Sequence, residues 1–265
     1  MTTDTILKPA LRLAAVDLGR AFRGRRGIPL ILMATLAPLL TLVVGYYQGR
    51  RLNLSTEYAN LFTFFILSGT LFFGTGWCFS SLFRGEVLER SLHYFFLTPV
   101  RREAITLGKY FTGVAATWLV FVPGTVLSYL FLFGQGGPSG TAHLTSARGV
   151  GVLLAYTGIT FLACAAYGAV FLALGLVAKS PFVPIAGVWL FERISTFLPV
   201  MLKRLTVGHY LNSLAPVPST LGVFSLLAEP EPLAVALLLP VALAAAILYS
   251  ATRRVRSMEI SYGVD

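Results

Sequence analysis

Five stretches of the chain contain no Asp, Glu, Lys or Arg, and each is long enough to cross a lipid bilayer. They are residues 28–47, 59–83, 110–133, 149–178 and 232–252. A hydrocarbon core about 30 Å thick needs roughly 20 helical residues at about 1.5 Å each, so all five qualify. Charged residues make up 12% of the chain and hydrophobic residues 56%, which excludes an ordinary soluble domain. The sequence therefore predicts an all-α polytopic membrane protein.

A sixth stretch, residues 181–200, is interrupted only by Glu192 and Arg193. A charge at the middle of a bilayer costs at least about 2.5–3.5 kcal/mol on insertion scales, so each residue needs a partner or water. One interpretation assigns both to a translocation path or gate. The other ends the helix near Phe191 and leaves both residues at the start of an outer segment. Their role stays open at this point.

With this stretch included, the chain is predicted to form one transmembrane domain over residues 1–265. The six transmembrane helices are expected at about residues 28–47, 59–83, 105–133, 149–178, 181–200 and 232–252. The connection between spans five and six, residues 201–231, is moderately apolar and broken by three prolines. We expect it to re-enter the outer leaflet as short helices, which is tolerated where protein covers the backbone.

Lys and Arg concentrate in segments that share one side of the membrane when six spans are counted. That side holds the N-terminal region, the connection at residues 84–102, Lys179 and the basic C-terminal region. Cytoplasmic loops carry an excess of Lys and Arg, so both termini are predicted to face the cytoplasm. These loops also account for the net charge of +10, and no nucleic-acid partner is expected.

Residues 5–26 are predicted to form an amphipathic helix in the membrane interface. Leu7, Leu11, Leu18 and Phe22 recur at helical spacing on one face, and basic residues occupy the other. The alternative is a cytoplasmic helix docked on another subunit.

The sequence contains none of the motifs that indicate a catalytic or metal site. There is no phosphate loop, no H-E-x-x-H and no serine nucleophile elbow. Cys78 and Cys164 lie within spans, without His or Cys partners at metal-ligand spacing, and are interpreted as packing residues. The chain is expected to be neither an enzyme nor the holder of a cofactor or metal.

The inner connection at residues 84–102 is predicted to contain a short amphipathic helix, because its apolar and charged residues separate at helical spacing. Pro99 ends this helix, since proline lacks a backbone donor and disfavours helix in the residue before it. A helix tied to two spans suits a surface on which a cytoplasmic partner docks. An ordinary solvated loop helix fits the same pattern. The candidate docking residues are Glu86, Glu89, Arg90, Leu92, Thr98 and Pro99.

This segment resembles the inner loop of ABC transporter permeases of the type-2 exporter (ABC-2) class. The resemblance rests on Glu86, Ser91-Leu92, Thr98-Pro99-Val100 and Gly108-Lys109. The layout is similar as well: an interfacial N-terminal helix, six spans, a short inner turn before span five and a re-entrant segment before span six. Val87 and Arg90 depart from the pattern, in which a second charged residue and a glycine are usual.

The resemblance implies the permease subunit of an ATP-driven exporter in the bacterial plasma (inner) membrane. Two permeases, identical or homologous, would pair with two cytoplasmic ATP-binding subunits, which would carry the ATP and Mg²⁺. ATP binding would push on residues 84–102 and reorient the spans around a path between the permeases. Substrates of such exporters include drugs, peptides, lipids and polysaccharides, and the resemblance does not choose among them.

Two alternatives remain open from the sequence. A six-span secondary transporter or channel would be marked by paired carboxylates at membrane depth or by internal repeats, and only Glu192 is available. A non-transporting membrane anchor would recruit an ATPase without passing a substrate.

Overall fold

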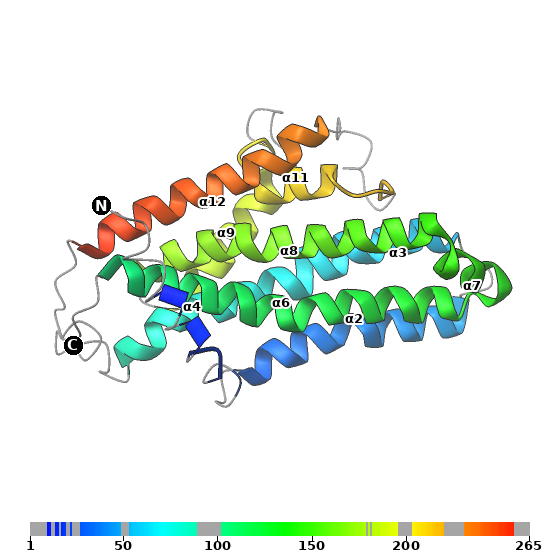
Figure 1. The fold of residues 1–265 in the computed structure, drawn as a ribbon, viewed down its shortest axis with the longest axis horizontal. Helices are drawn as coiled ribbons and strands as arrows, with labels where there is room; N and C mark the ends of the chain where they lie inside the picture. The colour runs from blue at the N-terminus through cyan, green and yellow to red at the C-terminus, as the bar shows by residue number, and fades with distance from the viewer. Residues whose placement is uncertain are drawn as a thin grey trace.

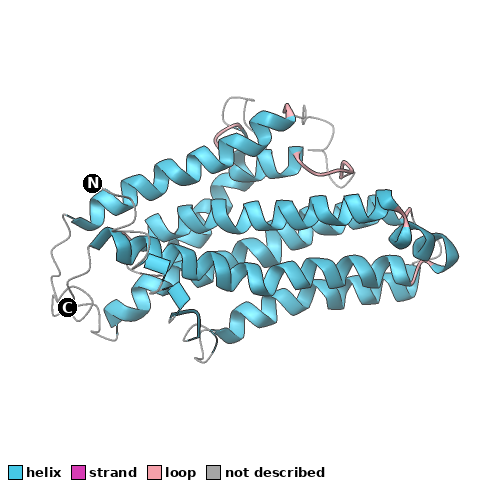
Figure 2. Cartoon of the chain, in the orientation of Figure 1, coloured by secondary structure: helices cyan, strands magenta, loops and turns pink. Residues whose placement is uncertain are grey.

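The computed structural model describes residues 10–11, 14–15, 17–19, 22, 27–48, 53–88, 102–178, 180, 182–195, 203–219 and 231–256. Within these residues the secondary structure is helical, without a strand (Figure 2), which confirms the all-α prediction. The helices are α2 (Gly27–Gln48), α3 (Leu54–Leu61), η1 (Phe62–Leu71), α4 (Phe72–Leu88), α6 (Arg102–Gly134), α7 (Gly137–Thr145), α8 (Ala147–Gly175), α9 (Phe182–Ser195), α11 (Val207–Ser213) and α12 (Leu233–Arg256).

Five helical segments in the described part of the chain are long and apolar enough to cross a membrane. They are Gly27–Tyr47, Leu54–Leu82, Glu103–Gly134, Ala147–Gly175 and Leu233–Val255. Helix α9 has 14 residues and rises only about 21 Å, less than a bilayer core of about 30 Å. Because residues 196–202 lie outside the described part, the expected sixth crossing stays a prediction.

The long helices form an elongated bundle in which the chain runs back and forth (Figure 1). Helix α6 packs against α2 and α8, α4 packs against α8, and α12 lies across α8 and α6. The end of α4 and the beginning of α6 lie at one end of the bundle, which we call the α4–α6 end. Helix α7 caps the opposite end, which we call the α7 end (Figure 1).

The second span is one continuous helix through α3, η1 and α4, with wider turns in its middle. Segment η1 is a π-helix of 10 residues whose flanking residues, Leu61 and Phe72, are right-handed helical. The Ser68 hydroxyl donates to the carbonyl of Thr63, five residues earlier, at 2.9 Å. Wide turns of this kind are frequent at functional sites.

Phe79 of α4 is fully buried, and its ring fills the space where α6 and α8 each carry a glycine. A Cβ atom on Gly113 or on Gly168 would lie 2.5 Å from this ring. A packed interior has no room for such an overlap. The two glycines therefore let α4, α6 and α8 meet around one side chain.

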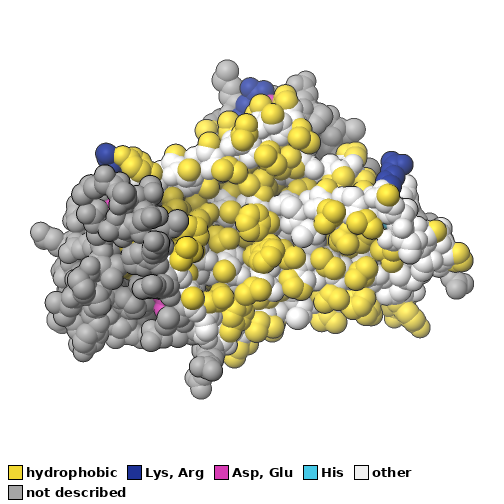
Figure 3. All heavy atoms as spheres, viewed as in Figure 1, with side chains coloured by type: hydrophobic (Ala, Val, Ile, Leu, Met, Phe, Trp, Pro, Cys, Tyr) yellow, Lys and Arg dark blue, Asp and Glu magenta, His cyan; other side chains and the backbone are white. Residues whose placement is uncertain are grey.

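Hydrophobic side chains cover the middle of the molecular face in Figure 3, and Lys and Arg side chains lie at its margins. On α2 and α12, Leu39, Leu233 and Leu238 are each more than half exposed. Soluble proteins rarely expose continuous apolar surface of this extent. These exposed apolar side chains and the five long apolar helices identify a multi-pass membrane protein.

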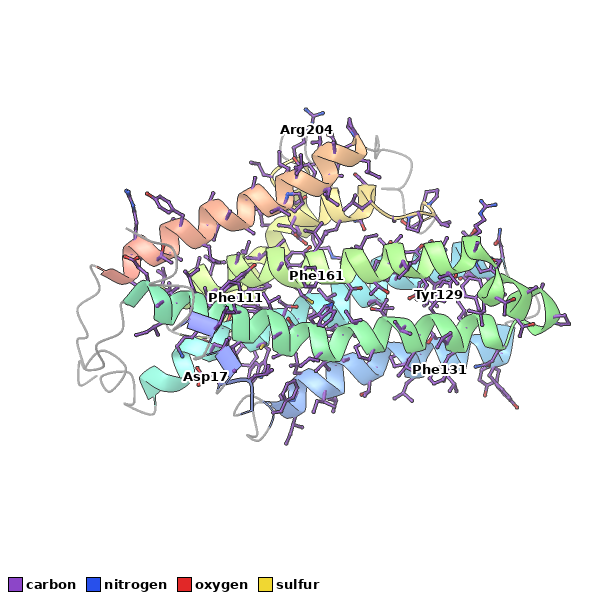
Figure 4. All side chains as sticks on the ribbon, in the orientation of Figure 1. Asp17, Phe111, Tyr129, Phe131, Phe161 and Arg204 are labelled. Carbon is purple, nitrogen blue, oxygen red and sulfur yellow. The ribbon has the colours of Figure 1, made fainter. Side chains whose placement is uncertain are left out.

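The N-terminal helical residues divide the predicted apolar face into two parts. Leu18 and Phe22 pack against the hydrophobic core, whereas Leu11 is 50% exposed. Asp17 lies near the beginning of α2 (Figure 4) and is buried. The location of this helix in the membrane interface stays a prediction.

Candidate functional site

Glu192, in the last turn of α9, is bound by residues of α8 and α11. The Tyr167 hydroxyl lies 2.9 Å from Oε1 and 3.0 Å from Oε2 of Glu192, so its hydrogen is donated to either oxygen or shared. The amide of Gly208, in the first turn of α11, donates to Oε1 at 3.3 Å. A carboxylate held away from bulk water needs such donors. We call Tyr167, Glu192 and Gly208 the Glu192 latch, because they join α8, α9 and α11.

The latch depends on close approach at residue 208. A Cβ atom on Gly208 would lie 3.2 Å from the Tyr167 hydroxyl and 3.4 Å from Oε2 of Glu192. Tyr167 itself is fixed by the core, since it is buried and its ring packs edge-on against Phe72 at a centroid distance of 5.1 Å. The donor therefore stays in place, and α9 and α11 are positioned against it.

Arg193 is the next residue of α9 but contacts a different part of the protein. Its guanidinium carbon lies 5.6 Å from the ring centroid of Phe64 in η1 and 5.6 Å from that of Trp189, one turn earlier in α9. Among the described residues, no hydrogen bond or ion pair involves its guanidinium group. The structure therefore separates Glu192 and Arg193, which the sequence presents as one polar interruption.

A second group of contacts holds α11 to the beginning of α12. Arg204 Nε donates to Oε1 of Glu231 at 2.7 Å, and His209 Nε2 lies 3.6 Å from the same oxygen. The Tyr210 hydroxyl donates to the carbonyl oxygen of Arg204 at 2.7 Å. Burial raises the pKa of Tyr210 and the negative Glu231 raises it further, while Arg204 acts in the opposite direction. Figure 4 shows Arg204 beside the first turn of α12.

The predicted coupling residues lie mostly outside the described part of the chain. The backbone of Glu86 belongs to the last turn of α4, whereas Glu89, Arg90, Leu92, Thr98 and Pro99 lie outside the described residues. The helices that flank the segment do meet. Lys109 of α6 is buried, and its Nζ lies 3.4 Å from the carbonyl oxygen of Leu82 in α4. The docking role of the segment stays a prediction.

The sequence pattern indicates Glu192 and Arg193 but not Tyr167 or Gly208. A tyrosine within a charge-free stretch carries no signal of its own, and neither does a glycine among many. A buried carboxylate such as that of Glu192 needs a hydrogen-bond donor. This requirement predicts that a donor exists but does not identify the residue that supplies it.

No group of three or more His, Cys, Asp or Glu residues that could hold a metal ion occurs in the described part of the chain. Cys78 and Cys164 are both buried, and neither forms a disulfide. Their placement agrees with the packing role expected of them.

Comparison with protein families gives a match over most of the chain. A family model described as ABC-2 family transporter protein matches residues 22–198, which is more than half of the chain. No curated protein matches the chain. The matched region contains Tyr167, Glu192 and Arg193 as well as the helices that flank the predicted coupling segment, and α11 and α12 follow it.

Proposed function

Because the chain belongs to the ABC-2 transporter family, we propose that it is the membrane-spanning permease subunit of an ATP-driven exporter. Two permeases, identical or homologous, form the translocation path. Two separate cytoplasmic ATP-binding subunits, which bind ATP and Mg²⁺, drive it. The observation that carries this proposal is the family match over residues 22–198 in a chain with five helices long and apolar enough to cross a membrane.

In this proposal the α4–α6 end of the bundle faces the cytoplasm of a bacterial cell, and both termini lie on that side of its plasma membrane. The last turns of α12, which include the exposed Arg253 and Arg254, lie at this end of the bundle (Figure 1). Lys and Arg are favoured on the cytoplasmic side. The α7 end then faces outward.

The ATP-binding subunits act on the segment that joins α4 to α6. A displacement of α4 is passed on by Phe79, because its ring is confined by Gly113 of α6 and Gly168 of α8. Gly168 follows Tyr167, whose hydroxyl holds Glu192. Packed side chains do not compress, so a small movement of α4 is transmitted to α8 and onward to the latch.

The Glu192 latch controls the outer segment in the same scheme. With the latch closed, α11 is held against α8 and α9. A shift of α8 relative to α9 breaks the Tyr167–Glu192 hydrogen bond and releases α11, which opens the outer end of the path. Switching between two packed arrangements of this kind is a common way of amplifying a small displacement.

Affinity purification of the full chain in mild detergent, with identification of the co-purifying chains, tests the proposal. We expect a soluble ATP-binding protein with a phosphate loop in a two-to-two ratio with the permease. Recovery of a lone chain that moves substrate without ATP would contradict the proposal and favour a secondary transporter or channel.

A further inference from the structure

Arg193 places a cation on a face of the molecule that is otherwise apolar. Arginine stays charged and presents five N–H donors. The rings of Phe64 and Trp189 lie below its guanidinium, and no acceptor among the described residues binds it. The surrounding exposed side chains of α9 are Leu190, Phe191 and Ile194.

In the orientation proposed above, this cation lies at the depth of the hydrocarbon core. From Phe182, where α9 begins, to Arg193 the helix rises about 16 Å. Tyr167, which binds the neighbouring Glu192, lies about 12 Å along α8 from the end of that helix at Gly175. Both distances run from the α4–α6 end, so the guanidinium is anchored well inside a core of about 30 Å. A guanidinium at this depth needs an anion or water.

Glu192 does not meet this need. Its oxygens already accept hydrogen bonds from Tyr167 and Gly208, and the two side chains contact different helices. The negative charge of Glu192 offsets that of Arg193 at longer range but leaves the guanidinium donors open. Phospholipid headgroups lie at the boundary of the core and are therefore a poor match for this position.

We propose that the face around Arg193, formed by α9, η1 and the first turn of α4, is a substrate-binding wall of the path and takes an anionic amphiphile. The carboxylate, sulfonate or phosphate group of the exported molecule binds Arg193. Its apolar body lies along Trp189, Phe64 and Phe73, which are all partly exposed. The rings support the guanidinium by cation–π contact and offer flat surfaces to a chain or ring. This inference rests on the proposed export function and names its substrate class.

The test measures binding to the full chain, with any co-purifying subunits, in phosphatidylcholine nanodiscs. The probes are 11-(dansylamino)undecanoate and its uncharged methyl ester, followed by dansyl emission. We expect Arg193→Gln to weaken binding of the acid by about tenfold or more, the size expected for loss of a charge-assisted hydrogen bond, and to leave the ester unchanged. Arg193→Lys should keep most of the affinity for the acid.

Arg253→Gln is the matched control, because Arg253 also lies over an aromatic ring, that of Tyr249 at 4.7 Å, but at the end of α12. It should change neither affinity. A folding defect weakens both probes, so the ratio of acid to ester affinity isolates the effect of the cation.

An unchanged ratio in Arg193→Gln overturns the inference. Loss of acid binding in nanodiscs that contain phosphatidylglycerol overturns it as well, because a lipid headgroup is then the occupant. Efficient cross-linking of Arg193→Cys to the same position of a second copy also overturns it, because the second copy then covers this face. Binding requires no ATP hydrolysis, so failure here is distinguishable from failure to co-purify an ATP-binding subunit.

Discussion

Tyr167 of α8 and Glu192 of α9 are 25 residues apart in the chain, and the tyrosine hydroxyl lies within 3.0 Å of both carboxylate oxygens. Near its beginning α9 packs against α4, where Ile185 lies beside Gly76. Together with the contact of Arg193 with Phe64, the hydrogen bond fixes the far end of α9. Because Gly208 binds the same carboxylate, it also fixes α11.

Tyr167→Phe should destabilise the protein by about 1–3 kcal/mol, because it removes a donor from a partly buried carboxylate. The measurement is the melting temperature of the purified protein in detergent. Tyr156→Phe on the same helix is the control, since the Tyr156 hydroxyl is buried without a hydrogen-bond partner. Its removal should be neutral or slightly stabilising. Equal losses in the two variants would show that the hydroxyl of Tyr167 does not hold the latch.

Replacement of Glu192 should loosen α11 while leaving the helical bundle folded. Glu192→Ala removes the acceptor of the Gly208 amide, so hydrogen exchange of the α11 amides should become faster. Glu192→Gln keeps a carbonyl oxygen at that place and should preserve most of the protection. Faster exchange throughout α8 and α6 in Glu192→Ala would instead indicate a general loss of stability.

Two glycines of α8 should respond in opposite ways when each is replaced by alanine. Gly168→Ala places a methyl group 2.5 Å from the Phe79 ring, and overpacking of this kind typically costs about 1–3 kcal/mol. Gly158→Ala meets no atom within 4 Å and should stabilise the helix by about 0.5–1 kcal/mol, because glycine is a poor helix former. Melting temperatures in detergent compare the two. A Gly168→Ala protein as stable as the parent would remove Phe79 from the proposed transmission.

The helices could be predicted from sequence because the bilayer imposes a local requirement. Each charge-free stretch must satisfy its own backbone groups as a helix, and its length alone reveals it. The described helices extend beyond several of these stretches; the second span, for example, begins at Leu54 and α4 ends at Leu88. A helix can continue past the end of a charge-free stretch, so composition predicts the ends of helices poorly.

The site could be predicted only in part, because its contacts join segments distant in the chain. Glu192 and Arg193 stood out as charges in an apolar stretch, but nothing local says that one contacts α8 and the other contacts η1. That division depends on the rotation of α9 about its axis, which is set by tertiary packing at Pro184 and Ile185, both buried. The π-helical turns of η1 were also invisible in the sequence pattern.

The coupling segment gives a prediction that separates folding from mechanism. Glu86→Ala, or replacement of Thr98-Pro99 by Ala-Ala, should leave membrane insertion and melting temperature unchanged, because the segment is expected to lie outside the hydrocarbon. Each change should weaken binding of the ATP-binding subunit or uncouple hydrolysis from transport. Co-purification yield and ATPase rate in proteoliposomes provide the two measurements. Full coupled transport by both variants would exclude this segment as the docking surface.

The two parts of the N-terminal apolar face should respond differently to a charge. Leu18 packs against the core, so Leu18→Glu buries a carboxylate and should lower the melting temperature in detergent and in bilayers alike. Leu11 is half exposed, and the exposed half of its side chain is expected to contact the membrane interface. Leu11→Glu should therefore lower the melting temperature in bilayers and have little effect in detergent. If a spin label at position 11 reports free water contact in the bilayer-embedded protein, the helix is a docking arm for another subunit and the interfacial assignment is wrong.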